Sequence, residues 1–501
     1  MNMTMDKILL RYPISQIRDQ LSALIVSNRG PVSLVDQDDG SLGIQRNSGG
    51  LVTALLGLAR QIDMTWLACA QNSTEVGLRQ KEVLLENGAH IQVEFIDPGE
   101  EAYNGYYNII ANPLLWFLQH SMWNTPLAPV IDRSVWQAWD EGYVIINQLF
   151  AHRIIHLLQN EKRSPLIMLQ DYHLYLTARH LRQFYGRSTP TISHFTHIPW
   201  PGPESWGLLP GPMREAILDG LCAADLLGFQ TRQDGLNFIR TCDAYLPSAE
   251  VKYTKGMVQY QNHTTHVRDF PISIDVDDLK SKIDSPEVVS FRDEISALVK
   301  DHRLILRIDR IEPSKNIIRG FQAFAELLEH HPEHRGKVVF LALLSPSRQE
   351  IDEYKEYLDV LMTSVGRVNA RYGNCDWEPV RVLIGENYNR AIAALQLYDI
   401  LLVNAIADGM NLVAKEGPIV NGKDGVLVLS DRAGAWQQLE SGSIVISPCD
   451  IVATAEALHQ GLTMDMATRH AQAIRLRELI EREDINAWLN AQLQTVTELN
   501  L

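Results

Sequence analysis

Short apolar runs rich in β-branched residues alternate with amphipathic stretches along almost the whole chain. This alternation constrains the fold more than any other feature of the sequence. The intervening stretches, such as Ile317–Leu328 and Ile351–Val365, repeat their apolar residues with helical spacing. Strands that alternate with helices form parallel sheets covered by helices, so the sequence predicts an α/β fold. The clearest strand-like runs are Ala23–Val26, Leu166–Leu169, Leu304–Leu306, Val338–Ala342, Ile400–Val403 and Val426–Leu429.

The chain is too long for a single ordinary hydrophobic core, since it has 501 residues. A polar stretch, Tyr260–His266, leads into Phe270–Asp275, and a charged helical pattern follows. We place a boundary here and predict two α/β domains of similar size, 1–275 and 276–470, with a cleft between them. The pattern of 471–501 is helical, and we expect this segment to cross back to the first domain.

Charge and cysteine content exclude several classes of protein. The formal net charge of −16 disfavours nonspecific binding to nucleic acid. No uncharged apolar run reaches the roughly 18 residues of a membrane helix, and Met1–Asp19 lacks the apolar core of a secretory signal. The five cysteines are scattered and form no CxxC pair, which argues against disulfides or a zinc site. We therefore expect a cytoplasmic protein without a membrane or nucleic-acid partner. Its oligomeric state stays open, and a homo-oligomer is compatible with the sequence.

The stretch Asp408–Glu416, with sequence DGMNLVAKE, follows the strand-like run Ile400–Val403 and leads into a helical pattern. A strand-to-helix turn of this kind lies at the carboxyl edge of a sheet, where open α/β sheets bind ligands. Gly409 allows a close approach of backbone, and the N–H groups of a starting helix attract phosphate. Two carboxylates on one phosphate would repel it, so we expect them to accept hydrogen bonds from sugar or ribose hydroxyls. The alternative is a capping Asp408 with a surface Glu416.

A second candidate site is the basic loop that follows the strand-like run at Leu304, with the sequence Arg310-Ile-Glu-Pro-Ser-Lys315. Arg310 offers a planar fork of donors and Lys315 a point charge, a combination suited to a pyrophosphate. A solvated basic loop is the alternative. Because this loop and the Asp408 stretch follow strands of the same predicted domain, we expect them to hold a nucleotide diphosphate sugar together.

Two further loops follow predicted strands of the first domain. Arg29 ends the first strand, and Gly49–Gly50 opens a helical pattern after a polar loop, where paired glycines can cradle phosphate. His194 and His197 lie three residues apart with no third ligand motif near them, which argues against a metal site. His197, at the strand end, is the better candidate for a binding site, with a structural histidine as the alternative.

Other candidates carry weaker signals. Asp171 lies just past the Leu166 strand, where a turn cap is equally compatible. The aromatic group Tyr106–Tyr107 with Trp116 could stack on a sugar ring or belong to the core. Arg367 could bind a phosphate or coat the surface of a helix.

Together, these stretches resemble the trehalose-6-phosphate synthase family, retaining glycosyltransferases of the GT-B fold with two Rossmann-like domains. The resemblance runs from about residue 23 to about residue 490. The motifs that carry it, in the order of the family, are SNR (27–29), SGGL (48–51), YYN (106–108), DYHL (171–174), HIPWP (197–201), LLGFQT (226–231), RIEPSK (310–315), GRVNARYG (366–373) and DGMNLVAKE (408–416).

The resemblance implies a reaction and a role for each candidate. The reaction is transfer of glucose from a nucleotide diphosphate glucose, UDP-glucose foremost, to glucose 6-phosphate, with no metal ligand or cofactor and the need for a divalent ion left open. The implied catalytic residues are Arg310, Lys315, Asp408 and His197. The implied donor contacts are Gly50, Arg310, Lys315, Met410, Asn411, Leu412, Val413 and Glu416. The implied acceptor contacts are Arg29, Tyr107, Trp116, Asp171 and Arg367.

Three departures from the family pattern leave alternatives open. The family's Trp-Ser-Gly stretch, whose Trp lines the acceptor pocket, reads here Trp66-Leu-Ala-Cys69-Ala. The usual His before DYHL is Gln170, and the usual Arg before DGMN is Ala407. The first departure leaves room for another acceptor, as in relatives that make glucosylglycerol phosphate or join pseudo-sugars. A catalytically silent regulatory homologue is the other alternative, although the donor-side residues are all present.

Overall fold

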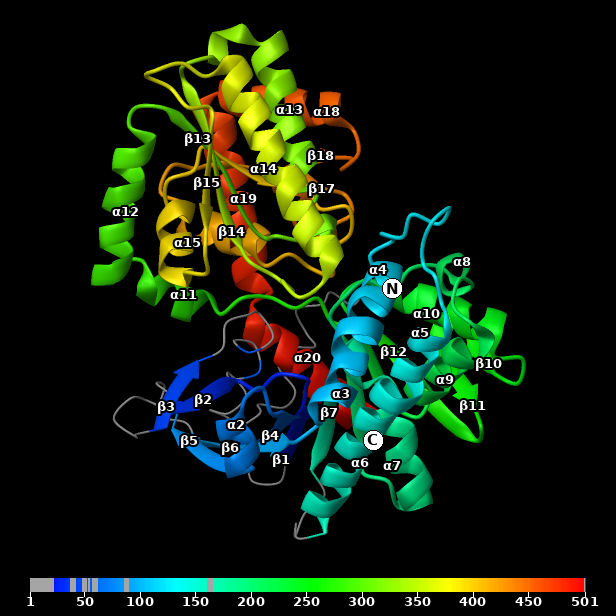
Figure 1. The fold of residues 1–501 in the computed structure, drawn as a ribbon. Helices are drawn as coiled ribbons and strands as arrows, with labels where there is room; N and C mark the ends of the chain where they lie inside the picture. Colours follow the sequence, from blue (N-terminus) through cyan, green and yellow to red (C-terminus); the bar gives the residue numbers. More distant parts are fainter. Residues whose placement is uncertain are drawn as a thin grey trace, which may run out of the picture. The chain divides into compact units, whose positions relative to one another are not determined.

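The structure is a computed structural model, and it describes residues 22–36, 42–46, 52, 55, 62–84, 90–159, 165–499 and 501. The chain divides into two compact units, and each is described by itself (Figure 1). Unit 1 consists of 1–118, 124–270 and 488–501, and unit 2 of 119–123 and 271–487. The predicted domain limits at 275 and 470 stay a prediction. The Ser48–Leu51 motif, with Gly50, lies outside the described residues.

Unit 1 is built on a ten-stranded sheet with the order β10-β11-β12-β9-β8-β7-β1-β4-β6-β5 among the described residues. Its inner strands are parallel, while β5, β10 and β11 pair antiparallel at the edges. A separate antiparallel hairpin is formed by β2 (Val32–Asp36) and β3 (Leu42–Arg46). The strands of the large sheet are β1 (Ser22–Val26), β4 (Asp63–Cys69), β5 (Gln80–Leu84), β6 (His90–Ile96), β7 (Leu166–Gln170), β8 (Ile192–Thr196), β9 (Leu226–Phe229), β10 (Glu250–Lys252), β11 (Met257–Tyr260) and β12 (His263–Asp269).

The chain order places a topological switch in this sheet between β1 and β7. From β1 the chain builds one side through β4 and β6, and from β7 it builds the other side through β8, β9 and β12. Central strands buried on both faces carry continuous apolar runs, as in Leu166-Ile-Met-Leu169. The helices of this unit are α2 (Ser73–Leu78), α3 (Glu100–Tyr103), the π-helices η4 (Asn104–Leu115) and η5 (Ala138–Val144), α4 (Trp116–Gln119), α5 (Arg133–Gln137), α6 (Ile145–Leu158), α7 (Thr177–Tyr185), α8 (Pro203–Trp206), α9 (Gly211–Leu221), α10 (Arg232–Tyr245) and most of α20 (Ile485–Glu498).

Unit 2 is built on a six-stranded, wholly parallel sheet with the order β15-β14-β13-β16-β17-β18 among the described residues. From β13 the chain adds β14 and β15 on one side and then returns to add β16, β17 and β18 on the other. The switch point therefore lies between β13 and β16. The strands are β13 (Arg303–Arg310), β14 (Val338–Ser345), β15 (Val380–Ile384), β16 (Ile400–Val403), β17 (Val426–Ser430) and β18 (Ile444–Ile446).

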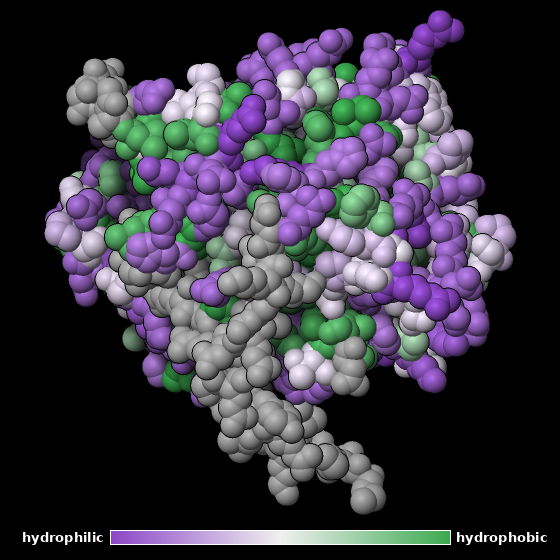
Figure 2. All heavy atoms as spheres, turned by 90° about the horizontal axis from the view of Figure 1, so that it is seen from below, coloured by the Kyte–Doolittle hydropathy of each residue, from purple (hydrophilic) through white to green (hydrophobic). Residues whose placement is uncertain are grey.

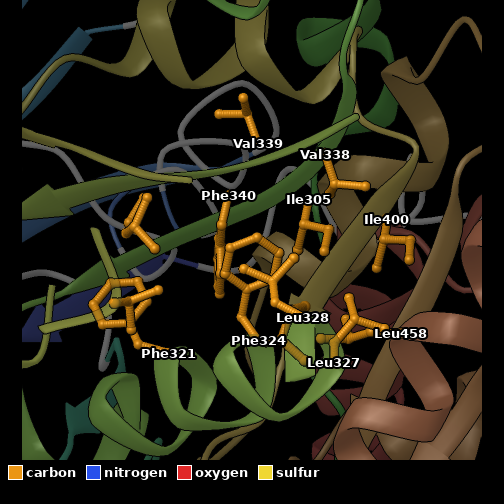
Figure 3. Close-up of a cluster of buried hydrophobic side chains, with 14 of the residues drawn as sticks. Ile305, Phe321, Phe324, Leu327, Leu328, Val338, Val339, Phe340, Ile400 and Leu458 are labelled. Atoms are coloured by element: carbon orange, nitrogen blue, oxygen red, sulfur yellow. The ribbon is translucent and has the colours of Figure 1, made fainter. Parts of the chain in front are cut away.

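Helices cover this sheet with the apolar faces that their sequences predict. In α13 (Ile317–His330), the buried residues Phe321, Phe324 and Leu328 follow helical spacing and pack against Phe340 of β14 (Figure 3). Each fully buried Phe side chain contributes roughly 1.5–3 kcal/mol to folding. The other helices are α11 (Val276–Lys282), α12 (Pro286–Val299), α14 (Asp352–Tyr372), α15 (Tyr388–Leu395), α16 (Val413–Val420), α17 (Trp436–Leu439), α18 (Ile451–Thr463) and α19 (Met466–Arg482).

The predicted α/β fold is confirmed, and each of the predicted strands is present. Among the helices of the described residues, none combines the length and hydropathy needed to cross a membrane. On the face in Figure 2, hydrophobic residues form small groups between hydrophilic ones. Scattered exposed apolar residues of this kind, such as Leu127 and Val130, are ordinary for a folded protein.

Candidate functional site

The switch point of unit 2 brings the two predicted donor loops together. The loop Ile311–Asn316 follows β13, and the Asp408 stretch follows β16, the neighbouring strand. The backbone of Ile406 donates to the Ser314 carbonyl at 2.9 Å, which ties the two loops directly. The Asn316 amide adds hydrogen bonds to the carbonyls of Asn404 (2.9 Å) and Pro448 (2.7 Å). The loops therefore form one connected surface at the carboxyl ends of the strands.

Lys315 and Asp408 form an ion pair at the centre of this surface. The Asn411 amide donates to the same Asp408 oxygen at 3.0 Å. Burial raises the pKa of the Asp408 carboxyl, but the Lys315 ammonium outweighs it, and the pKa lies below its usual value. Asp408 is therefore a charged acceptor, and Lys315 a cation held in place at the end of β13.

The backbone of the Asp408 stretch is fixed by close packing. A side chain at Gly434 would come within 1.8 Å of the Gly409 carbonyl oxygen, so only glycine fits at 434. Asn411 adopts a positive φ of 72°, and its side chain accepts from the N–H of Ala414 at 3.2 Å. This turn starts α16 at Val413, so the positive end of the helix dipole lies at the loop, where it favours an anion.

Arg310 and a second arginine, Arg348, pair with the same carboxylate, that of Glu312. The buried Glu312 accepts from Arg310 at 3.0 Å and from Arg348 at 2.9 Å, and Ser347 adds a hydrogen bond of 2.8 Å. Burial would raise the pKa of Glu312, but the two guanidinium groups lower it to about 2. Arg310 keeps 48% of its side-chain surface exposed, so it can still meet a ligand.

A buried arginine of β13, Arg307, holds the Lys315 loop in position. Arg307 is completely buried and donates to the carbonyl of Lys315 (2.6 Å), the amide oxygen of Asn404 (2.7 Å) and the carboxylate of Asp309 (2.8 Å). A side chain at Gly320 would come within 2.5 Å of its guanidinium. The guanidinium therefore links both donor loops to β13.

Glu416 and its neighbour Lys415 are titratable groups on α16. Burial raises the pKa of Glu416 to about 7, against a hydrogen bond from Tyr388 that lowers it. Burial lowers the pKa of Lys415 to about 7, and its ammonium donates to the Ile272 carbonyl at 2.8 Å. Both groups carry large desolvation penalties, which cluster at functional sites.

We expect Glu416→Gln to stabilise the chain at pH 8 and to have a much smaller effect on its stability at pH 5. The unfolded carboxyl ionises near 4.5 and the folded one near 7, so the folded state binds more protons between these values and stability falls as pH rises. Each pKa unit corresponds to about 1.4 kcal/mol, so the gain at pH 8 is at most about 3 kcal/mol. Thermal unfolding at both pH values measures the effect. The exposed Glu353→Gln serves as the control, and an equal gain at both pH values would contradict the prediction.

The switch point of unit 1 gathers the first-domain candidates that follow β7 and β8. Asp171 follows β7 with a positive φ of 71°, and its carboxylate accepts from the backbone N–H of His197 at 3.1 Å. The carbonyl of Asp171 lies 3.1 Å from the ring of His194. The Asp171 turn thus fixes the position of the chain where it leaves β8.

His197 is a neutral imidazole with a defined tautomer. Burial, with a contribution from His194, lowers its pKa to about 3. Its Nε2 lies 2.9 Å from the Gln170 amide oxygen, and its Nδ1 lies 3.5 Å from the Gln230 amide nitrogen. Nε2 therefore carries the proton and donates to Gln170. Gln170, which stands where the family pattern has a histidine, therefore orients His197.

We expect Gln170→Leu to lower the free energy of unfolding by about 1–3 kcal/mol, because it leaves a buried imidazole N–H without an acceptor. Urea unfolding followed by circular dichroism measures the loss. Gln259→Leu makes the same substitution at an exposed strand position and should change stability by less than about 0.5 kcal/mol. Equal effects of the two substitutions would show that the hydrogen bond to His197 contributes nothing.

Arg29, at the end of β1, lies beside the aromatic group of η4. Its guanidinium donates to the Tyr107 hydroxyl at 3.4 Å and lies 5.8 Å from the centre of that ring. Tyr107 stacks between Tyr103 and His173, with ring centres 5.4 and 5.9 Å away. Trp116 is buried and packs on Tyr172 at 5.7 Å, so most of its ring is covered by protein.

The profile of glycosyltransferase family 20 matches residues 21–498. The chain belongs to glycosyltransferase family 20. The resemblance to the trehalose-6-phosphate synthase family is thereby confirmed, and this family 20 chain is a glycosyltransferase.

Relatives of this family 20 chain match it over most of their length. A UDP-forming alpha,alpha-trehalose-phosphate synthase of Schizosaccharomyces pombe is 32% identical over 470 residues, 93% of this chain and 88% of that protein. A structure from E. coli bound with UDP-2-fluoro glucose is 28% identical, with a TM-score of 0.82 over 95% of this chain and 98% of that one. A synthase from Burkholderia xenovorans in complex with glucose-6-phosphate is 26% identical, with a TM-score of 0.81 over 95% and 100%. The expected GT-B fold class is confirmed.

One candidate acceptor residue, Arg367, lies apart from the clusters described above. Arg367 is exposed on α14, whose buried face carries Leu361, Val365 and Val368. Among the described residues it forms no hydrogen bond or ion pair with the Arg310 cluster. Its role in binding the acceptor stays a prediction, as do the roles of the other proposed site residues.

Sequence reasoning missed the residues that hold the site in place. Glu312 and Arg348 form the buried pair beside Arg310, and Arg307 supports Lys315. Glu312 lies inside the RIEPSK motif, so its position between two candidate cations was a usable signal. Arg348 has no such neighbour in sequence, because it comes near Glu312 only through the pairing of β13 with β14.

Proposed function

We propose that this family 20 glycosyltransferase transfers glucose from UDP-glucose to glucose 6-phosphate with retention, giving trehalose 6-phosphate. The names of its relatives support this, since they are UDP-forming trehalose-phosphate synthases. One of the solved relatives binds a UDP-glucose analogue and another binds glucose-6-phosphate. The observation that carries the proposal is the Lys315–Asp408 pair with Arg310 at the switch point of the six-stranded sheet.

The geometry of unit 2 suits the departure of a diphosphate. As the bond between the glucose and the diphosphate breaks, negative charge grows on the phosphate oxygens. Lys315, Arg310 and the positive end of the α16 dipole are held where they can stabilise this charge. A phosphate oxygen can accept the proton of the attacking hydroxyl, so the carboxylate pair of a glycoside hydrolase is not required.

We further propose roles for individual residues. Glu416 holds the ribose, the backbone of Met410–Val413 supports the diphosphate and donor sugar, and Asp408 and His197 contact glucose hydroxyls. On the acceptor side, we propose that Asp171 contacts hydroxyls of the acceptor sugar. The proposed contacts on the phosphate side of the acceptor are Arg29, Tyr107, Trp116 and Arg367. In domain terms, the first domain binds the acceptor and the second binds the nucleotide sugar.

We propose that the enzyme acts in a reducing compartment, the cytoplasm. All five cysteines are free thiols. Cys222 and Cys242 are buried with sulfurs 3.8 Å apart and remain unbonded. An oxidising compartment would favour disulfides over such a pair.

Assembly into a homo-oligomer stays a prediction. Light scattering of the purified chain would measure its oligomeric state.

A second acceptor is favoured by one specific observation. Where the family pattern has a Trp-Ser-Gly stretch whose Trp lines the acceptor pocket, this chain reads Trp66-Leu-Ala-Cys69-Ala, and Cys69 is fully buried at the end of β4. The polar Gln71 follows, and its side chain bonds to the Tyr103 hydroxyl (3.2 Å) and the Cys69 carbonyl (3.2 Å). A pocket lined by an amide in place of an indole could accept a polyol phosphate or a pseudo-sugar phosphate.

The test is a panel of donors and acceptors with identification of the product. We expect release of UDP from UDP-glucose that depends on glucose 6-phosphate, with trehalose 6-phosphate as the product. Release that depends instead on glycerol phosphate or a pseudo-sugar phosphate would establish the second acceptor. No release from UDP-, GDP- or ADP-glucose with any acceptor would identify a silent homologue and overturn the proposal.

A further inference from the structure

Three histidines and two glutamates gather at the end of α13 that lies away from the proposed donor site. His331 directly follows α13, and Glu333 and His334 lie in the next turn, η10 (Pro332–His334). Glu456 and His459 come from α18, which packs on α13 (Figure 1). Lys315 lies just before the first residue of α13, so the helix separates this cluster from the donor loops by about 20 Å at 1.5 Å per residue.

The side chains converge with their ligand atoms facing one another. His331 Nδ1, Glu333 Oε1 and His459 Nδ1 all lie within 4.8 Å of one another. The Glu333 oxygen is 3.6 Å from His331 and 3.9 Å from His459. Ligands of a tetrahedral zinc lie about 3.3 Å apart, because each lies about 2.0–2.1 Å from the metal. Rotation of the two histidine rings would bring the three atoms to that spacing.

The surroundings of these ligand atoms are those of a metal site. The other nitrogen of His331, Nε2, lies 3.0 Å from the Glu456 carboxylate. A metal-binding histidine commonly donates its second N–H to a carboxylate in this way, which fixes the ring and makes the ligand nitrogen more basic. The rings of His331 and His459 are stacked with centres 3.7 Å apart, so they have to rotate out of the stack before both in-plane lone pairs can point at one ion.

His334 offers a fourth ligand. Its Nε2 lies 3.0 Å from His459 Nδ1, close to the separation of two ligands on one metal. His334 comes from the same turn as Glu333 and is mostly buried, so its side chain is held beside the other ligands.

We propose that His331, Glu333 and His459, with His334, bind a divalent transition-metal ion of the zinc type. Imidazole nitrogens with one carboxylate suit zinc, cobalt or nickel, whereas magnesium and calcium prefer oxygen ligands throughout. The ion links the turn after α13 to α18. It therefore stabilises unit 2 and takes no part in sugar transfer.

The test is a titration of the full-length, untagged chain with zinc alone after removal of metals by a chelator. We expect one zinc per chain and a higher thermal midpoint with zinc than without. Glu456→Gln should weaken binding by about 10- to 100-fold, and His331→Gln and His459→Gln should weaken it further. Glu333→Gln, at an exposed position, provides a ligand variant with little risk to folding.

His330→Gln is the matched control, since His330 is the adjacent histidine on α13 and pairs with Glu326 outside the cluster. It should bind zinc and gain thermal stability as the unaltered chain does. Zinc binding that survives in His331→Gln and His459→Gln would place the ion elsewhere, for instance on the exposed Cys375 or Cys449, and overturn the proposal. Absence of zinc binding by the unaltered chain would overturn it as well.

Discussion

Lys315→Met should lower the turnover number by about 100- to 1000-fold, equivalent to about 3–4 kcal/mol of transition-state stabilisation. Lys315 is buried, paired with Asp408 and held by the Arg307 bond to its carbonyl, so no other cation can move into its position without rebuilding the loop. Methionine keeps the length of the side chain and removes its charge. Initial rates of UDP release with both substrates saturating measure the change.

The control for this prediction is Lys355→Met, at an exposed lysine of α14 that pairs with Asp352 at the surface. It should leave turnover unchanged. Circular dichroism of the Lys315 variant separates lost chemistry from lost folding. If Lys315→Met turned over at the normal rate, Lys315 could not be stabilising the leaving diphosphate, and the role proposed for the pair would be wrong.

Arg307→Met should destabilise the chain by about 3–5 kcal/mol, the cost of removing one partner from a buried ion pair. The carboxylate of Asp309, whose pKa burial already raises, would lose its partner. The carbonyl of Lys315 and the amide oxygen of Asn404 would lose their donor. Because the loop that carries Lys315 depends on this guanidinium, turnover should fall together with stability. Thermal and urea unfolding measure the stability change.

Arg371→Met tests whether the effect of Arg307→Met comes from burial. Arg371 pairs with Glu329 at 3.1 Å, but 64% of its side chain is exposed. Exposed pairs contribute about 0–1 kcal/mol, so this variant should unfold almost as the unaltered chain does. Similar losses of stability in the two variants would mean that the buried network around Arg307 contributes no more to the free energy of unfolding than an exposed ion pair.

The backbone of the fold was predictable because apolar runs and helical spacing report burial directly. The run Ile400–Val403 was predicted as a strand and is β16, and Ile317–Leu328 was predicted as a helix and lies within α13. The position of Asp408 at a strand end also followed from sequence. Its pairing with Lys315 required that β13 and β16 be neighbours, which the chain order alone did not reveal.

Buried charges account for most of what sequence reasoning missed. Charged residues are rarely buried, so Arg307 and Lys415 had no reason to be assigned to the interior. Both have partners far away in sequence: the Asn404 amide oxygen accepts from Arg307 across 97 positions, and the Ile272 carbonyl accepts from Lys415 across 143. A single sequence carries no signal for such pairings.

Because of the way the chain divides into units, no single cut in the gene yields two fragments that each encode a complete unit. Each unit includes a segment from a distant part of the chain: 488–501 for unit 1 and 119–123 for unit 2. A fragment ending at 270 would lack Trp488, whose ring packs on Phe195 and whose indole donates to the Phe270 carbonyl at 3.0 Å. A fragment beginning at 271 would lack 119–123. Neither half is encoded by one uninterrupted stretch, so a recombination event that exchanged either half as a block would leave both products incomplete.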